Sequence, residues 1–176
     1  MSALAFLIAI LVMNNTPQSV HLILQKRLFA QFHANYPEKE KNDILDDLLK
    51  GPGKIRVHFV TIAFGIGVDC PNIREVLHIG VPNTMEQYFQ ESGRAGRDGK
   101  PSVSKVFYNS YDVSRAQKNF QSVMKKFVLT DNCRKSVILE YFGFHIPKSN
   151  EEVLLHACCD NCALVCNCKH CQKKKT

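Results

Sequence analysis

Apolar residues in the first 110 positions fall into two kinds of run. Short runs rich in β-branched residues predict strands, and runs with apolar residues three or four apart predict helices. The opening stretch MSALAFLIAILVM is almost wholly apolar and predicts a buried strand. The further predicted strands are residues 55–62, 76–81 and 103–108, and the predicted helices are residues 37–50 and 85–91.

The helix predicted at residues 37–50 begins and ends clearly. Proline at its start suits a first helical turn, and the glycine after it stops the helix. Its apolar stripe consists of Ile44, Leu45, Leu48 and Leu49. Strands that alternate with helices predict an α/β fold in which helices flank a parallel sheet. In such sheets functional residues lie at the carboxyl ends of strands, so we expect the functional residues of this chain in residues 63–70 and 92–99.

After residue 110 the pattern is helical. Val113, Ala116, Phe120, Val123, Met124 and Phe127 keep helical spacing, and a second helix is predicted over residues 132–142 with Asp131 as its N-cap. We therefore expect three regions. They are an α/β lobe at residues 1–110, a small helical subdomain at residues 111–165, and a tail rich in Cys and Lys at residues 166–176.

The charge balance favours an acidic partner. Lysine and arginine number 23 against 16 acidic residues, which gives a formal net charge of +7. Such an excess favours nucleic acid, although a basic surface without a partner has the same composition. The apolar start is too short to span a bilayer, and neither a basic segment nor a cleavage site flanks it. We expect an intracellular protein that does not enter the membrane.

The segment QESGRAGRDG carries the strongest chemical signal. Arg94 and Arg97 are three residues apart, are separated by small residues, and can both project from one tight turn. Guanidinium groups are permanently charged and forked, so they suit phosphate, and an arginine supplied from outside a nucleotide cradle can stabilise a transferring phosphoryl group. A solvated basic turn is the alternative interpretation.

The segment TIAFGIGVD follows a predicted strand directly. Its glycines, Gly65 and Gly67, would let the backbone approach a ligand closely, and Asp69 could accept from a sugar hydroxyl or orient an arginine. Taken alone this signal is weak, because glycines after a strand are common in turns.

Seven of the 8 cysteines lie at or after position 133. In an intracellular protein such a cluster predicts a metal site. Cys159 and Cys162 form a CxxC turn that can present two sulfurs to one tetrahedral ion, and four thiolates would make a closed, structural zinc site. Cys133 and Cys158 are candidates for the other two ligands, with Cys166 or His156 as the alternative to Cys158. Cys166, Cys168, Cys171 and His170 could hold a second ion or form an exposed tail.

Together, TIAFGIGVD and QESGRAGRDG resemble motifs V and VI of superfamily 2 helicases in the form used by the RecQ family. The resemblance covers residues 32–162 and includes FHANYPEKEKNDIL, VLHIGVP, NCRKSVILEYFG and CCDNC. It implies a second RecA-like lobe followed by the RecQ zinc-binding subdomain. In that family ATP lies in a cleft between two such lobes.

The resemblance also implies roles for individual residues. Arg97 and Arg94 would face the ATP phosphates, with Arg97 the better arginine finger, and Gln90 would couple the lobes. Asp69, Gly67 and Gly93 would lie near the nucleotide, and Thr61, His33, Arg115 and Lys118 would contact DNA. The adjacent cysteines match the spacing in part of the family, which implies the zinc ligands Cys133, Cys158, Cys159 and Cys162.

The sequence contains no GxxxxGK[ST] phosphate loop and no DExH box. Both are needed to hold ATP and Mg²⁺, so we expect the chain to need a first lobe, supplied separately or missing, for catalysis. The resemblance predicts the C-terminal part of an ATP-dependent 3′-to-5′ DNA helicase that acts on single-stranded and fork-like DNA in the nucleus. The alternatives are a DNA-binding zinc module without enzymatic activity and a degenerate helicase fragment.

Overall fold

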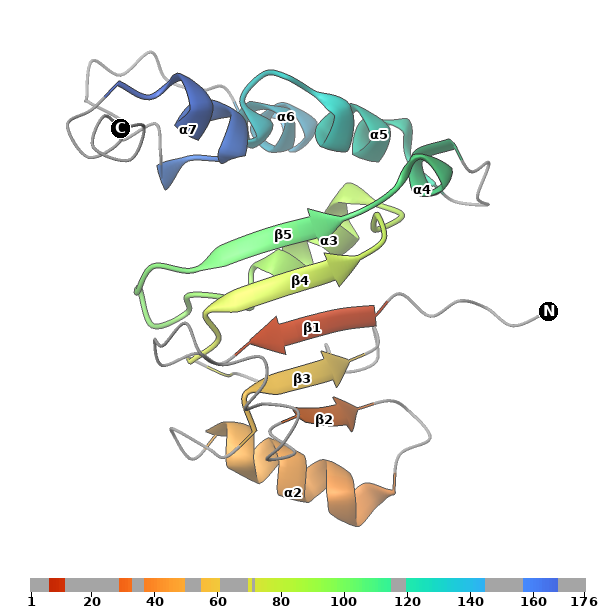
Figure 1. Ribbon diagram of the computed structural model, residues 1–176, viewed down its shortest axis with the longest axis vertical. Helices are drawn as coiled ribbons and strands as arrows, with labels where there is room; N and C mark the ends of the chain where they lie inside the picture. Colours follow the sequence, from red (N-terminus) through yellow and green to blue (C-terminus); the bar gives the residue numbers. More distant parts are fainter. Residues whose placement is uncertain are drawn as a thin grey trace. The chain divides into compact units, whose positions relative to one another are not determined.

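The computed structural model describes residues 7–11, 29–32, 37–49, 55–60, 70, 72–114, 120–144 and 157–167. The chain divides into two compact units (Figure 1). The first unit comprises residues 1–82 and 86–116 and contains the sheet. The second comprises residues 83–85 and 117–176. Along the sequence, the second unit begins for most of its length after residue 116. The domain boundary predicted near residue 110 stays a prediction.

The first unit is built on one five-stranded sheet with the order β2-β3-β1-β4-β5. The strands are β1 Leu7–Leu11, β2 Phe29–Phe32, β3 Val57–Val60, β4 Glu75–Ile79 and β5 Val103–Phe107. The predicted strands after residue 50 are thus confirmed, and the apolar start of the chain contributes the central strand β1. The predicted α/β class is confirmed.

The sequence predicted a parallel sheet, but one strand of the sheet is antiparallel to its neighbours. β2 pairs with β3 and β4 pairs with β5 in parallel, but β1 runs antiparallel to both β3 and β4. The physical reason is that an apolar run fits a central position in either direction, because strand backbones can pair both ways. Hydrophobic periodicity carries no information on direction.

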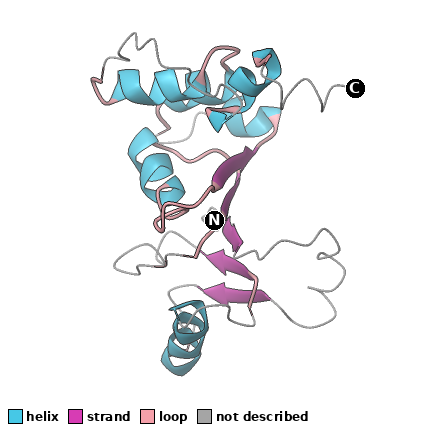
Figure 2. Cartoon of the chain, turned by 90° about the vertical axis from the view of Figure 1, so that its left-hand side faces the viewer, coloured by secondary structure: helices cyan, strands magenta, loops and turns pink. Residues whose placement is uncertain are grey.

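Two helices cover one face of the sheet. α2 Glu38–Leu49 links β2 to β3, and α3 Met85–Ser92 links β4 to β5. Both connections advance across the sheet in the same sense, so right-handed crossovers place both helices on the same face, as Figure 2 shows. Leu48 of α2 packs into a core with Val60, Ile73 and Val76. Leu49, which was predicted to belong to the buried stripe, is exposed.

The long helical pattern after residue 110 is broken. It forms α4 Ser110–Ser114 and α5 Ser122–Leu129, and the backbone of Gln121 between them is extended. Gln121 makes hydrogen bonds that a continuous helix would not allow. Its backbone N–H donates to Asn83 O at 2.9 Å, and its side chain accepts from Met85 N at 2.9 Å and donates to the Tyr141 hydroxyl at 3.2 Å.

The second unit continues with α6 Arg134–Tyr141 and α7 Asp160–Val165. The N-cap of α6 is Cys133 rather than the predicted Asp131. The helix starts later because Asn132 N donates to Thr130 Oγ1, which closes a turn before it. None of the helices in the described ranges combines the length and the apolar composition needed to cross a membrane.

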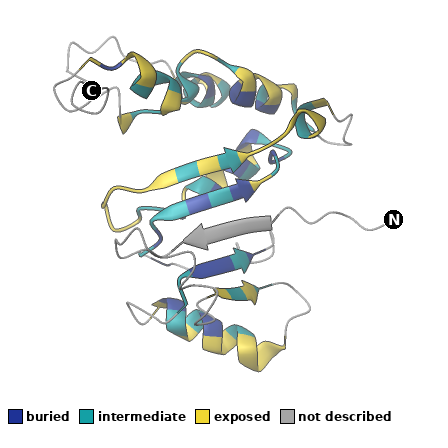
Figure 3. Cartoon of the chain, in the orientation of Figure 1, coloured by how far each residue is buried: buried dark blue, intermediate teal, exposed yellow. Residues whose placement is uncertain are grey.

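His58, the second residue of β3, is fully buried, and Figure 3 shows most of this strand as buried. Within the described part of the chain, neither of its ring nitrogens has a hydrogen-bond partner. Burial lowers the pKa of His58 from 6.5 to about 4, and the nearby carboxylate of Asp47 only partly offsets this effect. His58 therefore packs inside the sheet as a neutral ring.

The buried neutral ring of His58 makes the free energy of unfolding depend on pH. Below pH 6.5 the unfolded chain binds a proton that the folded chain binds only near pH 4, so acid favours unfolding. From about pH 7.5 to about pH 5 we expect a loss of about 2 kcal/mol from this residue. Urea unfolding of the wild type and of His58→Gln at both pH values measures the difference. An equal loss in the two proteins would contradict the prediction.

Candidate nucleotide and metal sites

The arginine loop, residues 93–99, follows α3 without a break. Gly93 N donates to Phe89 O at 2.9 Å, which continues the helical bonding, and Ala95 N donates to Ser92 O at 3.1 Å. The chain then turns back toward β5, with Gly99 N bonded to Gly96 O at 2.9 Å. The structure thus places Gln90, Gly93, Arg94 and Arg97 along one helix end and its turn.

Gly96 is required by the geometry of this turn. Its φ of +73° lies in the left-handed region, which residues other than glycine rarely adopt. A Cβ atom there would lie 2.4 Å from Ser102 Oγ and 3.1 Å from Lys100 O. The glycine lets the two arms of the loop approach each other.

The two arginines of the loop differ in environment. Arg94 is only 6% exposed, whereas Arg97 is exposed. Burial and then repulsion from Arg97 lower the pKa of Arg94, and the charge of Glu91 opposes this shift. Arg97 stays at the surface, where its Nε donates to Gly93 O at 3.4 Å. The exposed guanidinium is therefore the one that can reach a ligand outside this unit.

A buried polar network lies beneath the end of α3. Glu91 Oε2 is 3.1 Å from His78 Nε2, and Glu91 Oε1 accepts from Gln87 Nε2 at 3.1 Å. His78 Nδ1 is 3.3 Å from Lys105 O. The sequence patterns considered above did not point to this network. The available signal was a histidine in a strand and a glutamate in the helix that follows it.

Six predicted site residues lie outside the described residues. They are the nucleotide residues Gly67 and Asp69 and the DNA residues Thr61, His33, Arg115 and Lys118. Gln90, which was predicted to couple the lobes, is described and is exposed on α3. Its role stays a prediction.

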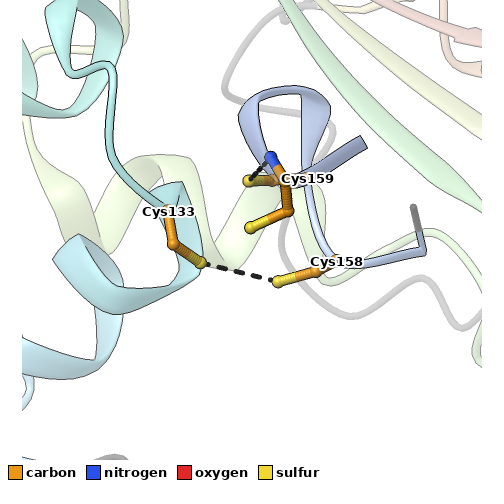
Figure 4. A group of neighbouring side chains, drawn as sticks. Cys133, Cys158 and Cys159 are labelled. Carbon is orange, nitrogen blue, oxygen red and sulfur yellow. Dashed lines mark hydrogen bonds between the residues drawn. The ribbon is translucent and has the colours of Figure 1, made fainter. Parts of the chain in front are cut away.

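The structure brings the four predicted cysteines together. Cys133 is the N-cap of α6, Cys159 is the N-cap of α7, Cys158 precedes it, and Cys162 lies in the first turn of α7. The four sulfur atoms all lie within 4.8 Å of one another. In Figure 4 the sulfur atoms of the labelled cysteines point toward a common centre, and those of Cys133 and Cys158 are 3.6 Å apart.

The cluster fits a tetrahedral metal ion. Sulfurs that bind one ion at about 2.3 Å in tetrahedral geometry lie about 3.8 Å apart, close to the distances seen here. Burial opposes ionisation of Cys133, but hydrogen bonds to Ser136 and then to Cys158 and Cys162 outweigh it and lower its pKa to about 6. Burial and the neighbouring sulfurs raise the pKa of Cys158 and of Cys162. Cys133 thus ionises more readily than Cys158 and Cys162, and a bound cation would stabilise their thiolates.

Side chains next to the cysteines in the sequence connect the helices around the cluster. Arg134 donates to both carboxylate oxygens of Asp160, from Nε at 2.6 Å and from Nη2 at 2.9 Å. The same guanidinium donates to Phe127 O at 2.5 Å, at the end of α5. Asn161 donates to Thr130 O and to Asn132 O, both at 2.7 Å. These bonds hold α5, α6 and α7 together independently of any ion.

The alternative ligands predicted from the sequence are not part of this cluster in the described residues. Cys166 is buried at the C-terminal end of α7, but it does not belong to the group of four. His156, Cys168, His170 and Cys171 lie outside the described residues. Cys158, in contrast, lies within the group.

Comparisons with known proteins agree with this geometry. Residues 8–99 match the helicase conserved C-terminal domain family, and residues 102–163 match the RecQ zinc-binding family. The chain is 31% identical over 155 residues to the ATP-dependent helicase wrn-1 of Caenorhabditis elegans. The aligned segment covers 78% of this chain and 14% of that protein. The chain is 36% identical over 121 residues to the ATP-dependent DNA helicase Q-like 2 of Arabidopsis thaliana (63% of this chain, 16% of that protein).

A third relative is the RecQ-like DNA helicase BLM of Xenopus laevis. It is 37% identical over 162 residues, which cover 79% of this chain and 12% of that protein. The chain thus spans only a small part of the length of each of these relatives. The two family matches lie in the same order as the arginine loop and the four-cysteine cluster. The chain therefore belongs to the RecQ family of helicases and corresponds to its helicase C-terminal domain followed by the RecQ zinc-binding region.

Proposed function

We propose that this chain forms the second motor lobe and the zinc-binding subdomain of an ATP-dependent 3′-to-5′ DNA helicase. The observation that carries the proposal is the arginine loop, in which Arg97 is exposed at the end of a helix while Arg94 is held inside. The names of the relatives, which describe ATP-dependent helicases, support the reaction class.

In this proposal Arg97 acts across the cleft between two lobes. Its guanidinium would meet the phosphates of an ATP held by a first lobe and stabilise the charge that develops as the terminal phosphoryl group leaves. Arg94 would contribute its charge from inside the loop. Gln90 would sense closure from the exposed side of α3, and Gly93, Gly67 and Asp69 would lie beside the nucleotide.

ATP and Mg²⁺ would be bound mainly by that first lobe. The 176 residues contain neither the phosphate loop nor the acidic box that hold them. We therefore assign this chain the role of completing the ATP site rather than forming it. A first lobe, whether part of the same polypeptide or a separate one, is the partner that the proposal requires.

DNA is the proposed substrate, in single-stranded and fork-like forms. The formal net charge of +7 and exposed lysines such as Lys125 on α5 favour phosphate contacts. Thr61, His33, Arg115 and Lys118 would add contacts along the same strand. A helicase that acts on chromosomal DNA would work in the nucleus, which we propose as its location.

Zinc is the proposed occupant of the four-cysteine cluster. Four thiolates select a soft divalent ion, and a closed site of this kind stabilises a fold rather than performing catalysis. The Arg134–Asp160 contacts would then orient the two segments that carry the ligands.

Hydrolysis of ATP tests the role of Arg97. The chain alone should show no DNA-stimulated hydrolysis, whereas a fusion to the first lobe of the Xenopus relative should. In the fusion, Arg97→Ala should lower kcat by about a thousandfold, because a finger acts on the transition state. Lys39→Ala, which removes an exposed cation from α2 instead, is the control and should change kcat less than about twofold. Hydrolysis by the chain alone, or an active Arg97→Ala fusion, would overturn the assignment.

Binding of labelled single-stranded DNA to the chain, followed by fluorescence anisotropy at several salt concentrations, tests the nucleic-acid role. Lys125→Glu should raise Kd by about three- to tenfold and reduce the salt dependence, because it removes phosphate contacts. Lys39→Glu on α2 is the control of equal charge change. DNA binding without any ATP hydrolysis in the fusion would favour the alternative, a DNA-binding zinc module. A Kd that does not respond to salt would contradict both.

Metal content tests the zinc proposal. The purified chain should hold about one zinc ion tightly, and Cys158→Ser should release it because a four-thiolate site loses a ligand. Cys166→Ser should keep the ion, since Cys166 lies outside the cluster. Zinc is measured by elemental analysis, and thermal unfolding should show a lower Tm for Cys158→Ser. Full zinc content in Cys158→Ser would show that another residue completes the site.

A further inference from the structure

The arginine loop is attached to the sheet at its far side as well as through α3. Gly96 N donates to Ile73 O at 3.0 Å, and Val103 N donates to Arg74 O at 3.0 Å. Residues 72–74, which lead into β4, therefore form the support on which the loop rests. The position of Arg97 depends on this support, because Arg97 lies directly after Gly96.

Arg74 makes the central contact of this support. Its Nη2 donates to Asp98 Oδ1 at 2.6 Å, its Nε donates to Asn72 O at 3.3 Å, and its Nη1 donates to Pro101 O at 3.4 Å. One planar guanidinium thus joins the start of β4 to the end of the arginine loop and to the segment that follows it. A lysine could supply the charge but not three donors in fixed directions.

Asp98 receives further contacts that keep it in this position. Lys100 N donates to Asp98 Oδ1 at 3.2 Å, and Lys100 Nζ is 3.8 Å from Asp98 Oδ2. The hydrogen bond from Arg74 holds the pKa of Asp98 below its usual range, although partial burial opposes this shift. The carboxylate is therefore charged at neutral pH, and the contact with Arg74 is an ion pair.

The side-chain contacts of Arg74 and Asp98 add to the backbone hydrogen bonds of the loop, which contains two glycines with positive φ. Gly96 and Gly99 both have positive φ, at +73° and +75°, and a side chain on Gly99 would meet nothing within 4 Å. Arg94 and Arg97 also repel each other. Flexible glycines and two like charges favour opening of the loop, and an ion pair at Asp98 opposes it.

We propose that Arg74 and Asp98 are positioning residues that hold the arginine loop so that the Arg97 guanidinium projects in one direction. The functional importance of this direction rests on the proposed function, in which Arg97 faces the ATP phosphates. The clamp itself is a property of this chain and can be tested without ATP.

Hydrogen exchange and NMR on the full chain test the clamp. Arg74→Met should accelerate exchange of the Gly96 and Gly99 amides by about tenfold and shift the Nε–Hε signal of Arg97, because the loop loses its anchor. Asp98→Asn, which keeps the shape of the side chain, should act in the same direction. Arg74→Lys should fall between wild type and Arg74→Met. Lys105→Met, which removes the neighbouring ion pair with Glu75, is the matched control and should leave the Arg97 signal unchanged.

Unchanged exchange and an unchanged Arg97 signal in both Arg74→Met and Asp98→Asn would overturn the clamp. The first-lobe fusion separates this result from the proposed function. There Arg74→Met should lower kcat by about tenfold with little change in the KM for ATP, and Arg74→Lys should recover part of it. If Arg97→Ala lowers kcat and Arg74→Met does not, the clamp is wrong. If Arg97→Ala has no effect, the role of Arg97 is wrong, and the exchange measurements still decide whether the clamp exists.

Discussion

Two guanidinium groups three residues apart repel each other, and much of the first unit is arranged so that this pair can stay in one tight turn. Arg94 is buried, which costs solvation, and the charge of Glu91 nearby offsets part of that cost. Glu91 is fixed in turn by His78 and Gln87. At the exposed side of the turn, the ion pair of Arg74 and Asp98 joins the turn to the start of β4. β4 therefore supports both ends of the motif.

The sequence predicted most of the chemistry and less of the geometry. Arginines between glycines and a CxxC pair are local patterns, so the arginine loop and the pair Cys159 and Cys162 could be predicted from neighbouring residues, whereas the assignment of Cys133 and Cys158 came from the resemblance to the RecQ family. The direction of β1 could not be predicted, because the pattern of an apolar strand is the same for a parallel and an antiparallel neighbour. Nor could the break at Gln121, which depends on bonds to residues nearly 40 positions away. The support by Arg74 depends on residues 24 positions apart, which no spacing rule connects.

In the second unit, the described helices α5 and α6 bury few apolar residues. Met124, Phe127, Val128 and Val137 are its buried apolar residues among those described in α5 and α6. So few apolar residues stabilise a fold only weakly, and small domains commonly add a metal ion or other links. The contacts of Arg134 and Asn161 bring the cysteine segments to the ends of α5 and α6. They reduce the entropy lost when an ion binds, because the four sulfurs are already close.

The acidic residues of QESGRAGRDG help to keep this basic loop folded. Glu91 and Asp98 both contact residues outside the motif, His78 in one case and Arg74 in the other. Their charges therefore stabilise the loop from the side of the sheet, at fixed positions. In the function we propose, a phosphate that approaches Arg97 from solvent would meet a guanidinium whose surroundings need little rearrangement, and preorganised charge of this kind stabilises a transition state more than a ground state. Under that proposal, the placement of the two carboxylates would matter as much for phosphoryl transfer as that of the two arginines.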